Sequence, residues 1–329
     1  HFGDKVPLML VPAIFISTTI THLFGGSAGR EGAALQIGGS LGCYIGRAFR
    51  LDDKDMRLAT LCGMSAVFAA LFGTPLTATL FALEVISVGV IYYSALVPCI
   101  VASLFALEMA NIFGITPTHF DVVIEPISEL MLLKVSALAI VCSLMSTVFC
   151  LSMHKTEHLF AKLIKNPYLR IAAGGALVVL ITAILGTGDY NGAGMNIIKR
   201  AIEEGQAKPD AFFWKLILTA ITIGCGFKGG EVVPTFFIGA TLGCVLGSLL
   251  GIPTGFAAAI GLICVFCGAV NCPVASIVLS IELFGSTDLV YFALACGIAY
   301  MLSGYFGLYS SQKIMYSKLK AEFINIHAK

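Results

Sequence analysis

The sequence predicts an all-α polytopic membrane protein, and three observations support that fold class. Of the 329 residues, 58% are hydrophobic and only 12% are charged, and the mean hydropathy is +0.93. A soluble domain carries roughly 25% charged residues, because its surface must be solvated. Long stretches of the chain carry no charge, and many of them are interrupted by glycine or proline. Soluble enzyme folds are therefore largely excluded, and a net charge of +1 implies no general attraction to nucleic acid.

The first predicted element is an apolar helix over residues 6–23. The chain begins at His1, with no initiator methionine and no signal-peptide pattern before this helix. We therefore expect a fragment that lacks an N-terminal portion.

Further helices are predicted where charged residues are missing, since a membrane span needs about 20 apolar residues. These stretches are residues 58–83, 85–107, 135–153, 171–188, 232–281 and 289–312. The longest, 232–281, is divided into three by the breaks at residues 251–255 and 271–273. Many pieces are too short to cross a bilayer perpendicular to its plane, and broken backbone at membrane depth must be buried by protein or lie beside a wet cavity. We expect a bundle of about 13 or 14 tilted and broken helices.

Three clusters of basic residues predict which loops face the cytoplasm under the positive-inside rule. The clusters are Arg47, Arg50, Lys54 and Arg57; Lys155, Lys162, Lys165 and Arg170; and Lys313, Lys318, Lys320 and Lys329. The loop with Asp121 and Glu125 has no lysine or arginine, which fits the outside. The C-terminus is therefore expected in the cytoplasm.

Cysteines and histidines give no clear metal or redox site. Cys264 and Cys267 form a CxxC within an apolar run, which fits small side chains packed between helices better than a redox or metal pair. His154 and His158 lie four residues apart, but in a basic loop. We expect no metal and no cofactor.

An internal repeat is the most informative feature of the chain. Pro75 aligns with Pro273 and Glu84 with Glu282 at a shift of 198, and each glutamate follows its proline by nine residues. The glycines at 38, 42 and 46 recur at 239, 243 and 247. Chance likeness of apolar sequence is the alternative, which the matched spacing disfavours. Two repeats with interrupted helices are typical of a secondary transporter that binds its substrate between the repeats, near the membrane midplane.

Each repeat contains a glycine-rich loop that leads into a helix. Residues 25–32 lead into a helix from Ala33, and residues 228–234 lead into a helix from Thr235. Glycine lets backbone amides approach a ligand closely, and a helix start offers unpaired N–H groups with a partial positive charge. Both loops therefore predict an anion site that needs no cationic side chain.

Glu31 is the acid singled out in the first loop. A carboxylate at such a helix start is itself an anion, so it can occupy the site and leave it when protonated. One side chain would then couple anion occupancy to proton transfer, whereas the alternative is a glutamate that caps its own helix. Glu231 is either protonated or paired with Lys228, and Glu84 and Glu282 fit solvated or capping groups.

Tyr309 follows a glycine-rich break and is expected to start a last helix, where its hydroxyl could face an anion. Tyr305 and Tyr316 are its rivals, and a place in the interfacial aromatic belt is the alternative for all three.

These motifs resemble the CLC family of anion channels and anion/proton antiporters. Residues 29–32, Gly-Arg-Glu-Gly, are similar to its G-[K/R]-E-G-P motif with Ala33 in place of proline, and residues 230–234 are similar to its G-x-F-x-P motif with Val232 in place of phenylalanine. The breaks at 72–76 and 271–273 resemble its paired helix breaks, and Tyr309 falls at its pore tyrosine. The likeness covers essentially the whole chain, from near the fifth of the family's eighteen helices.

The resemblance implies a CLC-type inverted-repeat bundle over residues 1–329 that lacks its N-terminal helices and has no cytoplasmic regulatory domain. The remainder of repeat one would span about 1–110 and repeat two about 128–322, and the family's first anion loop would precede His1. Glu31 would be the gating, proton-coupling glutamate. The implied anion-binding residues are Gly29, Arg30, Gly32, Ala33, Gly230, Glu231, Val232, Val233 and Tyr309.

Two departures from the family point to one branch of it. Chloride antiporters carry an acidic pair where this chain has Glu84 and Val85, and the acidic Glu231 resembles the fluoride-exporting bacterial branch. The resemblance thus implies an antiporter that exports fluoride across the bacterial inner membrane in exchange for protons, as a homodimer in the lipid bilayer. A chloride/proton antiporter or a passive chloride channel of the same family is the alternative.

Other classes of protein fit less well. A cation-coupled symporter would need carbonyl-rich helix C-termini at its site, and a noncatalytic assembly subunit would show no flux when purified. An enzyme is not expected, because no nucleophile–base pair or metal-ligand cluster is visible in the apolar segments.

Overall fold

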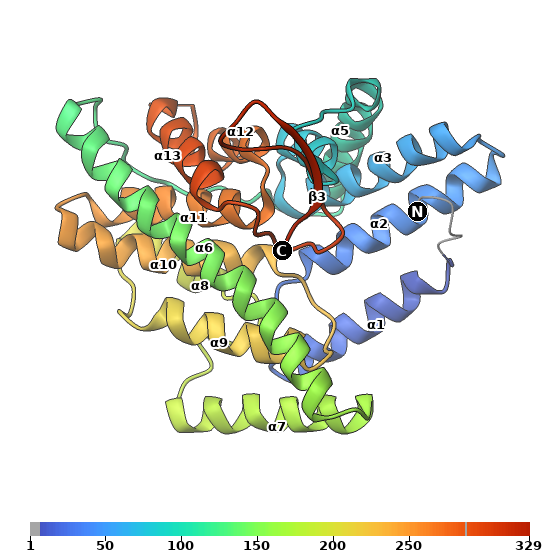
Figure 1. Cartoon of the computed structure of the whole chain (residues 1–329), viewed down its shortest axis with the longest axis horizontal. Coiled ribbons are helices and arrows are strands. Elements are labelled where there is room, and N and C mark those ends of the chain that lie inside the picture. Colours follow the sequence, from blue (N-terminus) through green and yellow to red (C-terminus); the bar gives the residue numbers. More distant parts are fainter. Residues whose placement is uncertain (1–6, 287) are drawn as a thin grey trace.

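The computed structural model describes residues 7–286 and 288–329, so residue 6 of the first predicted helix lies outside the described residues. The described residues form thirteen α-helices, two other short helices and three short strands (Figure 1). The α-helices are α1 (Leu10–Leu23), α2 (Glu31–Ala48), α3 (Asp53–Phe72), α4 (Pro75–Glu84), α5 (Leu96–Ile112), α6 (Glu129–Leu163), α7 (Pro167–Leu185), α8 (Met195–Lys199), α9 (Ala211–Gly224), α10 (Val232–Leu250), α11 (Thr254–Val270), α12 (Pro273–Phe284) and α13 (Leu289–Leu302). The short helices are a 3₁₀ turn at Tyr93–Ala95 and a π turn at Arg200–Glu204, and the strands are β1 (Ser87–Val88), β2 (Lys313–Tyr316) and β3 (Phe323–His327).

Helix lengths confirm the predicted bundle of broken helices. Within the described residues, five helical segments are long and apolar enough to span a membrane, namely Asp53–Phe72, Tyr93–Ile112, Glu129–Leu163, Pro167–Leu185 and Val232–Leu250. Five more apolar helices, α1, α9, α11, α12 and α13, have only 10–17 residues. The long helix α6 runs diagonally across the whole molecule, and α7 lies along one edge (Figure 1). Helices shorter than a span must be packed among others, because lipid cannot satisfy their ends.

The predicted breaks lie where backbone geometry ends and restarts a helix. Gly73 and Asn271 take left-handed conformations, with φ of 75° and 59°, and end α3 and α11. Two residues later, Pro75 and Pro273 begin α4 and α12, where a missing N–H costs no hydrogen bond. The charge-free stretch 232–281 is thereby divided into α10, α11 and α12, as predicted.

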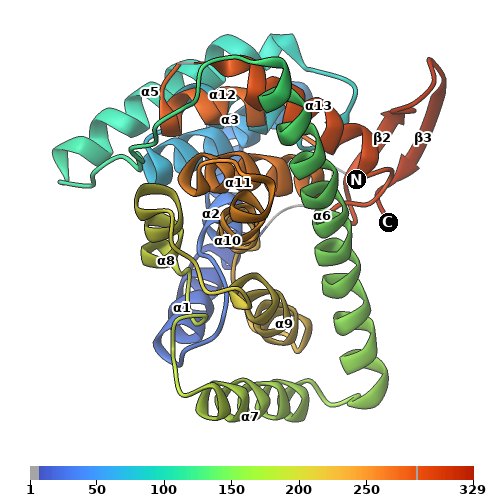
Figure 2. The same cartoon turned by 90° about the vertical axis from the view of Figure 1, so that its left-hand side faces the viewer.

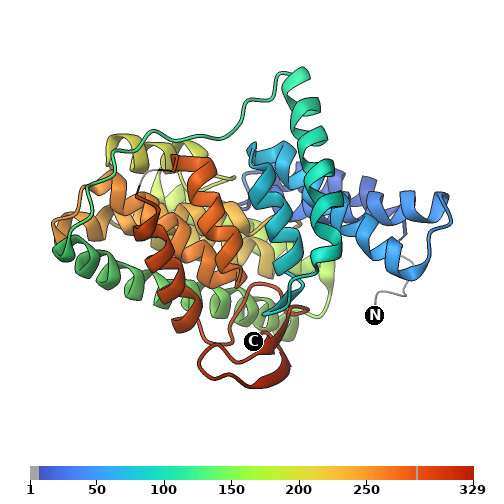
Figure 3. The same cartoon turned by 90° about the horizontal axis from the view of Figure 1, so that it is seen from above.

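Each repeat contains the same kind of close helix crossing, between α2 and α3 in the first and between α10 and α11 in the second. A Cβ on Gly38 of α2 would overlap the carbonyl oxygen of Gly63 on α3, and a Cβ on Gly239 of α10 would overlap that of Gly261 on α11. Small residues at such a crossing let helix backbones approach closely in a membrane. The pair α10 and α11 lies at the centre of the molecule, with α2, α6 and α13 around it (Figure 2). In an 18-residue stretch of α10, 78% of the residues are buried, against 28% in such a stretch of α3. An extended segment links α5 to α6, and thus the two halves, along one side (Figure 3).

The end of the chain differs from the sequence prediction. Helix α13 ends at Leu302, so Tyr309 does not start a last helix but lies in a loop. Strand β2 follows, pairs antiparallel with β3 and runs parallel to β1, with Ser87 opposite Lys313. Strand β1 in turn occupies the stretch after α4, so the helix predicted within 85–107 begins only at Leu96. This sheet joins strands more than 200 residues apart, a pairing that local periodicity does not reveal.

Candidate anion site

The two glycine-rich loops meet inside the protein. The backbone N–H of Gly29 donates to the carbonyl oxygen of Gly230 at 2.7 Å, and the N–H of Gly230 donates to that of Gly29 at 2.5 Å. This two-residue antiparallel bridge places the start of α2 beside the start of α10. Two helix starts that the sequence separates by about 200 residues are therefore joined by backbone alone.

Glycine is required for this approach. A Cβ on Gly230 would lie 2.8 Å from the backbone nitrogen of Glu31, and a Cβ on Gly32 would lie 3.0 Å from the Cα of Gly230. Real Cβ atoms avoid such separations, so any larger residue at Gly230 would push the loops apart. The glycines predicted to let amides approach a ligand thus serve first to let the loops approach each other.

Both helix starts leave backbone N–H groups available. Neither Arg30 before α2 nor Glu231 before α10 makes a side-chain cap, so the first N–H groups of each helix lack the usual partner. These groups include those of Gly32, Ala33, Val232 and Val233. Such groups carry a partial positive charge, and two sets side by side favour an anion between them. The side chain of Arg30 is exposed, so the guanidinium lies away from this junction while its backbone belongs to it.

Glu31 places its carboxylate at the junction. The side chain is 4% exposed, and its Oε2 makes no hydrogen bond to any described residue. The carboxylate faces the backbone N–H groups of Arg30 and of Glu31 itself. A methyl group on Gly29 would overlap Oε2, and one on Gly230 would lie 3.3 Å from it, so the carboxylate lies over the bridge between the loops.

Glu231 and Tyr309 lie near the same junction. The Tyr309 hydroxyl is buried, has no hydrogen-bond partner among the described residues, and is within electrostatic range of both Glu231 and Glu31. Glu231 forms no ion pair with Lys228 in the described part of the chain, so the pairing considered from the sequence is not found. The structure thus brings together Glu31, Glu231 and Tyr309, which were predicted from distant positions in the sequence. Their roles stay predictions.

The rival tyrosines are used elsewhere. The Tyr305 hydroxyl lies 2.9 Å from Oγ of Ser317, and Tyr316 is 47% exposed with its ring packed on Phe323. The Tyr309 loop is held from behind by two contacts, from Nε2 of His154 to the carbonyl of Gly307 at 2.8 Å and from the Leu308 N–H to the carbonyl of Ala269 at 2.9 Å. His154 therefore fastens a loop to α6.

Glu84 and Glu282 cap helices, but each caps the helix of the other repeat. The Glu84 carboxylate accepts from the N–H groups of Val274 at 3.3 Å and Ala275 at 2.9 Å, at the start of α12. The Glu282 carboxylate accepts from those of Leu76 at 2.9 Å and Thr77 at 2.8 Å, at the start of α4. This exchange is the clearest sign of the two-fold relation between the repeats, and its only signal in the sequence is the equal spacing from proline to glutamate.

The CxxC cysteines pack between helices. The Cys264 thiol lies 3.4 Å from the carbonyl oxygen of Ala139, and the Cys267 thiol lies 3.5 Å from that of Cys296. Both are fully buried and free. This supports the interpretation as small side chains between helices.

Sequence reasoning missed a polar cluster behind the first loop. Oγ of Ser27 donates to the carbonyl of Tyr190 at 2.7 Å and lies 3.1 Å from Oγ1 of Thr219, and the Ser27 N–H donates to Oγ1 of Thr222 at 3.1 Å. Lys215, fully buried on α9, belongs to the same cluster. Its only signal in the sequence is a lone charge in an apolar helix.

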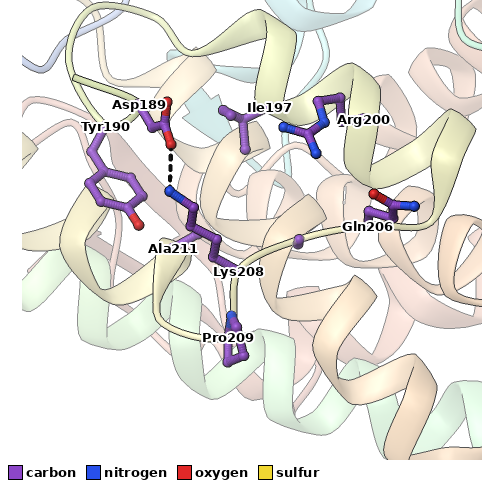
Figure 4. Close-up of a pocket in the computed structure, with 9 residues that line it drawn as sticks. Asp189, Tyr190, Ile197, Arg200, Gln206, Lys208, Pro209 and Ala211 are labelled. Atoms are coloured by element: carbon purple, nitrogen blue, oxygen red, sulfur yellow. Dashed lines mark hydrogen bonds and ion pairs between the residues drawn. The ribbon is translucent and has the colours of Figure 1, made fainter. Parts of the chain in front are cut away.

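A separate surface pocket of about 360 Å³ is lined by residues between 189 and 211, from loops and from the ends of short helices (Figure 4). Its rim carries Lys208, whose Nζ donates to Oδ2 of Asp189 at 2.7 Å and lowers the pKa of that carboxyl below its ordinary value. Arg200 and Gln206 also line it, and none of the predicted anion-site residues does.

The fold and the junction define a class, that of helical membrane proteins with inverted repeats whose helix starts meet inside the protein. The chain matches the voltage gated chloride channel family over residues 1–304, and it belongs to that family.

Individual relatives agree with this assignment. A chloride/fluoride channel protein of Pseudomonas syringae pv. tomato is 40% identical over 320 residues, which are 95% of this chain and 71% of that protein. The crystal structure of a CLC-type fluoride/proton antiporter is similar with a TM-score of 0.91 at 34% identity, over 94% of this chain and 78% of that one. A slow cyanobacterial Cl⁻/H⁺ antiporter shares the fold, with a TM-score of 0.74 at 20% identity over 89% of this chain and 72% of that one.

Proposed function

We propose that this protein exports fluoride in exchange for protons. The observation that carries the proposal is the Glu31 carboxylate, buried over the bridge between two uncapped helix starts with one oxygen unpaired. A carboxylate and a halide compete for the same N–H groups because both are anions. Protonation removes the charge of the carboxylate, so the neutral side chain leaves the N–H groups and the anion binds them instead. Each exchange between the carboxylate and the halide then moves a proton in one direction and an anion in the other.

Fluoride is the anion we favour. It is small and tightly hydrated, so a site must replace its water shell with N–H and O–H donors. The N–H groups of residues 32, 33, 232 and 233 and the unpartnered hydroxyl of Tyr309 are the donors that converge here. Glu231 would serve the handling of fluoride at this same place. The 40% identical relative is named for chloride and fluoride, and the solved neighbour for fluoride and protons.

The setting of this activity follows from the same resemblance. The protein would work as a secondary active transporter in a bacterial inner membrane, with the C-terminus in the cytoplasm and a second copy of the chain beside it. The basic clusters support the orientation. The two repeats would be the units from about residue 1 to 110 and from about 128 to 322.

Reconstitution into liposomes tests the proposal. With a fluoride gradient imposed, we expect fluoride efflux and opposite proton movement, followed by a fluoride electrode and a pH-sensitive dye. Robust chloride flux without fluoride flux would instead support the chloride antiporter or channel.

Glu31→Ala then separates coupling from leak. Removal of the carboxylate should abolish proton movement whether or not anion flux remains. A wild type that moves anions without protons would be a channel, and the assignment of Glu31 to coupling would fail.

A further inference from the structure

Lys215 is a buried cation in an apolar helix. It is fully buried and is the only charged residue of α9. Its Nζ donates to the carbonyl oxygens of Tyr190 at 3.1 Å and Gly192 at 2.5 Å, and lies 5.2 Å from the centre of the Phe237 ring. Two carbonyls satisfy two of the three N–H groups of an ammonium, but they do not neutralise its charge.

No carboxylate lies within ion-pair distance of Lys215 in the described residues. A buried charge without a partner is costly, and an intramembrane lysine is therefore a functional candidate. The acid whose charge reaches Lys215 is Glu31. The unpaired ammonium and the unpaired carboxylate oxygen thus lie in the same part of the protein without direct contact.

The contacts of Lys215 lead to the loop before Glu31. The Tyr190 carbonyl that binds Lys215 also accepts from Oγ of Ser27, and the N–H of Gly192 donates to the carbonyl of Gly26 at 2.9 Å. Lys215, on α9, therefore binds the peptide segment 190–192, which also holds residues 26–27 in place. Its ammonium is held by backbone carbonyls and not by the Glu31 side chain.

We propose that Lys215 is the fixed counter-charge of the site that Glu31 and the transported anion occupy in turn, a positioning residue for that exchange. The proposal rests on the proposed function of Glu31. The ammonium favours a negative charge at the junction at every stage, first the carboxylate and then the halide. It would thereby keep the site from standing empty, which would leave a buried cation unbalanced.

Anion binding by variants of Lys215 tests this role. Sodium fluoride is titrated into the purified full chain in detergent, followed by isothermal titration calorimetry. Lys215→Gln keeps N–H donors for the two carbonyls but loses the charge, and Lys215→Met loses both. Lys215→Arg keeps the charge. Lys134→Met is the matched control, because Nζ of Lys134 donates to the carbonyl of Gly251 at 2.7 Å far from the junction.

We expect Lys215→Gln and Lys215→Met to weaken fluoride binding about tenfold or more, the order of a unit charge acting through several ångströms of protein. Lys215→Arg and Lys134→Met should stay within about twofold of the wild type. Wild-type affinity in Lys215→Gln, with loss only in Lys215→Met, would mean that the residue merely clamps the loop and would overturn the proposal.

Two further comparisons cover misfolding and a wrong anion. If Lys215→Gln does not fold, the double variant Glu31→Gln/Lys215→Gln removes both charges and should fold again, and a double variant that also fails counts against the pairing. If the wild type binds chloride instead of fluoride, the same series is titrated with sodium chloride. The fluoride assignment then fails while the role of Lys215 is still decided.

Discussion

Two pairs of glutamates at helix starts, Glu84 with Glu282 and Glu31 with Glu231, have opposite surroundings. Glu84 and Glu282 each place both carboxylate oxygens on backbone N–H groups of the other repeat. Glu31 lies over the start of its own helix with its Oε2 unpaired, and the Glu231 side chain precedes α10 without capping it. Glu84 and Glu282, the inner pair, join α4 to α12, whereas Glu31 and Glu231, the outer pair, lie at the junction of α2 and α10.

The comparison shows the same group fully paired in one place and partly unpaired in another. A carboxylate with one fixed N–H donor on each oxygen gains from staying charged and in place. A buried carboxylate with an unpaired oxygen gains less, so a proton or a competing anion can displace it. Each repeat has two such acids, and we expect the number of paired carboxylate oxygens to separate their roles.

Gly230→Ala should have the largest effect, because it separates the two loops that carry the outer pair and leaves the inner pair unchanged. The added Cβ would lie 2.8 Å from the nitrogen of Glu31 in an interior with no room to yield. We expect a loss of about 1–3 kcal/mol of unfolding free energy and at least a tenfold loss of anion flux in liposomes. Gly188→Ala is the control, since a Cβ there meets nothing within 4 Å. Normal flux in Gly230→Ala would show that the bridge is not needed.

Glu84→Gln addresses the inner pair. One oxygen becomes an NH₂ group that faces the N–H groups of Val274 and Ala275, so α12 loses part of its cap. We expect a loss of about 1–2 kcal/mol in denaturant unfolding in detergent, and a smaller loss for the less buried Glu282→Gln. Anion flux per folded protein should not change. The exposed Glu108→Gln is the control, and a Glu84→Gln variant as stable as that control would contradict the capping role.

Glu31→Gln should have the smallest effect on stability. The substitution removes a buried charge whose Oε2 has no partner, but it also leaves the Lys215 ammonium without the acid whose charge reaches it. The two effects oppose each other, so the unfolding free energy should change by less than about 1 kcal/mol. The same denaturant unfolding measures it beside Glu84→Gln. A loss as large as that of Glu84→Gln would mean that Glu31 caps its own helix, the alternative that the sequence left open.

Much of this arrangement could be predicted from the sequence, because it depends on local features such as helix breaks, residue spacing and glycines. The breaks before Pro75 and Pro273 and the spacing to Glu84 and Glu282 predicted the repeat, and the glycines predicted close backbone approach. The exchange of caps could not be predicted, since spacing along one helix says nothing about which helix faces it.

The misses have the same physical origin. Tyr309 was placed at a helix start because glycine and apolar residues precede it, whereas strand pairing with residues 87–88 decides the local structure. Lys215 passed unnoticed because a single lysine in an apolar run has several explanations, and only the packed neighbours reveal its burial. The roles of Glu31, Glu231 and Tyr309 themselves stay predictions.

The chain's last residues hold the loop that carries Tyr309. Residue 329 donates its N–H to the carbonyl of Tyr305 and accepts from the N–H of Gly307, and the N–H of Ala328 donates to the carbonyl of Gln312. Backbone hydrogen bonds thereby connect the loop of the buried Tyr309 hydroxyl to residues 328–329. A tag or cut placed within residues 323–329 would therefore weaken the loop that positions the Tyr309 hydroxyl, although these residues make no hydrogen bond to that hydroxyl.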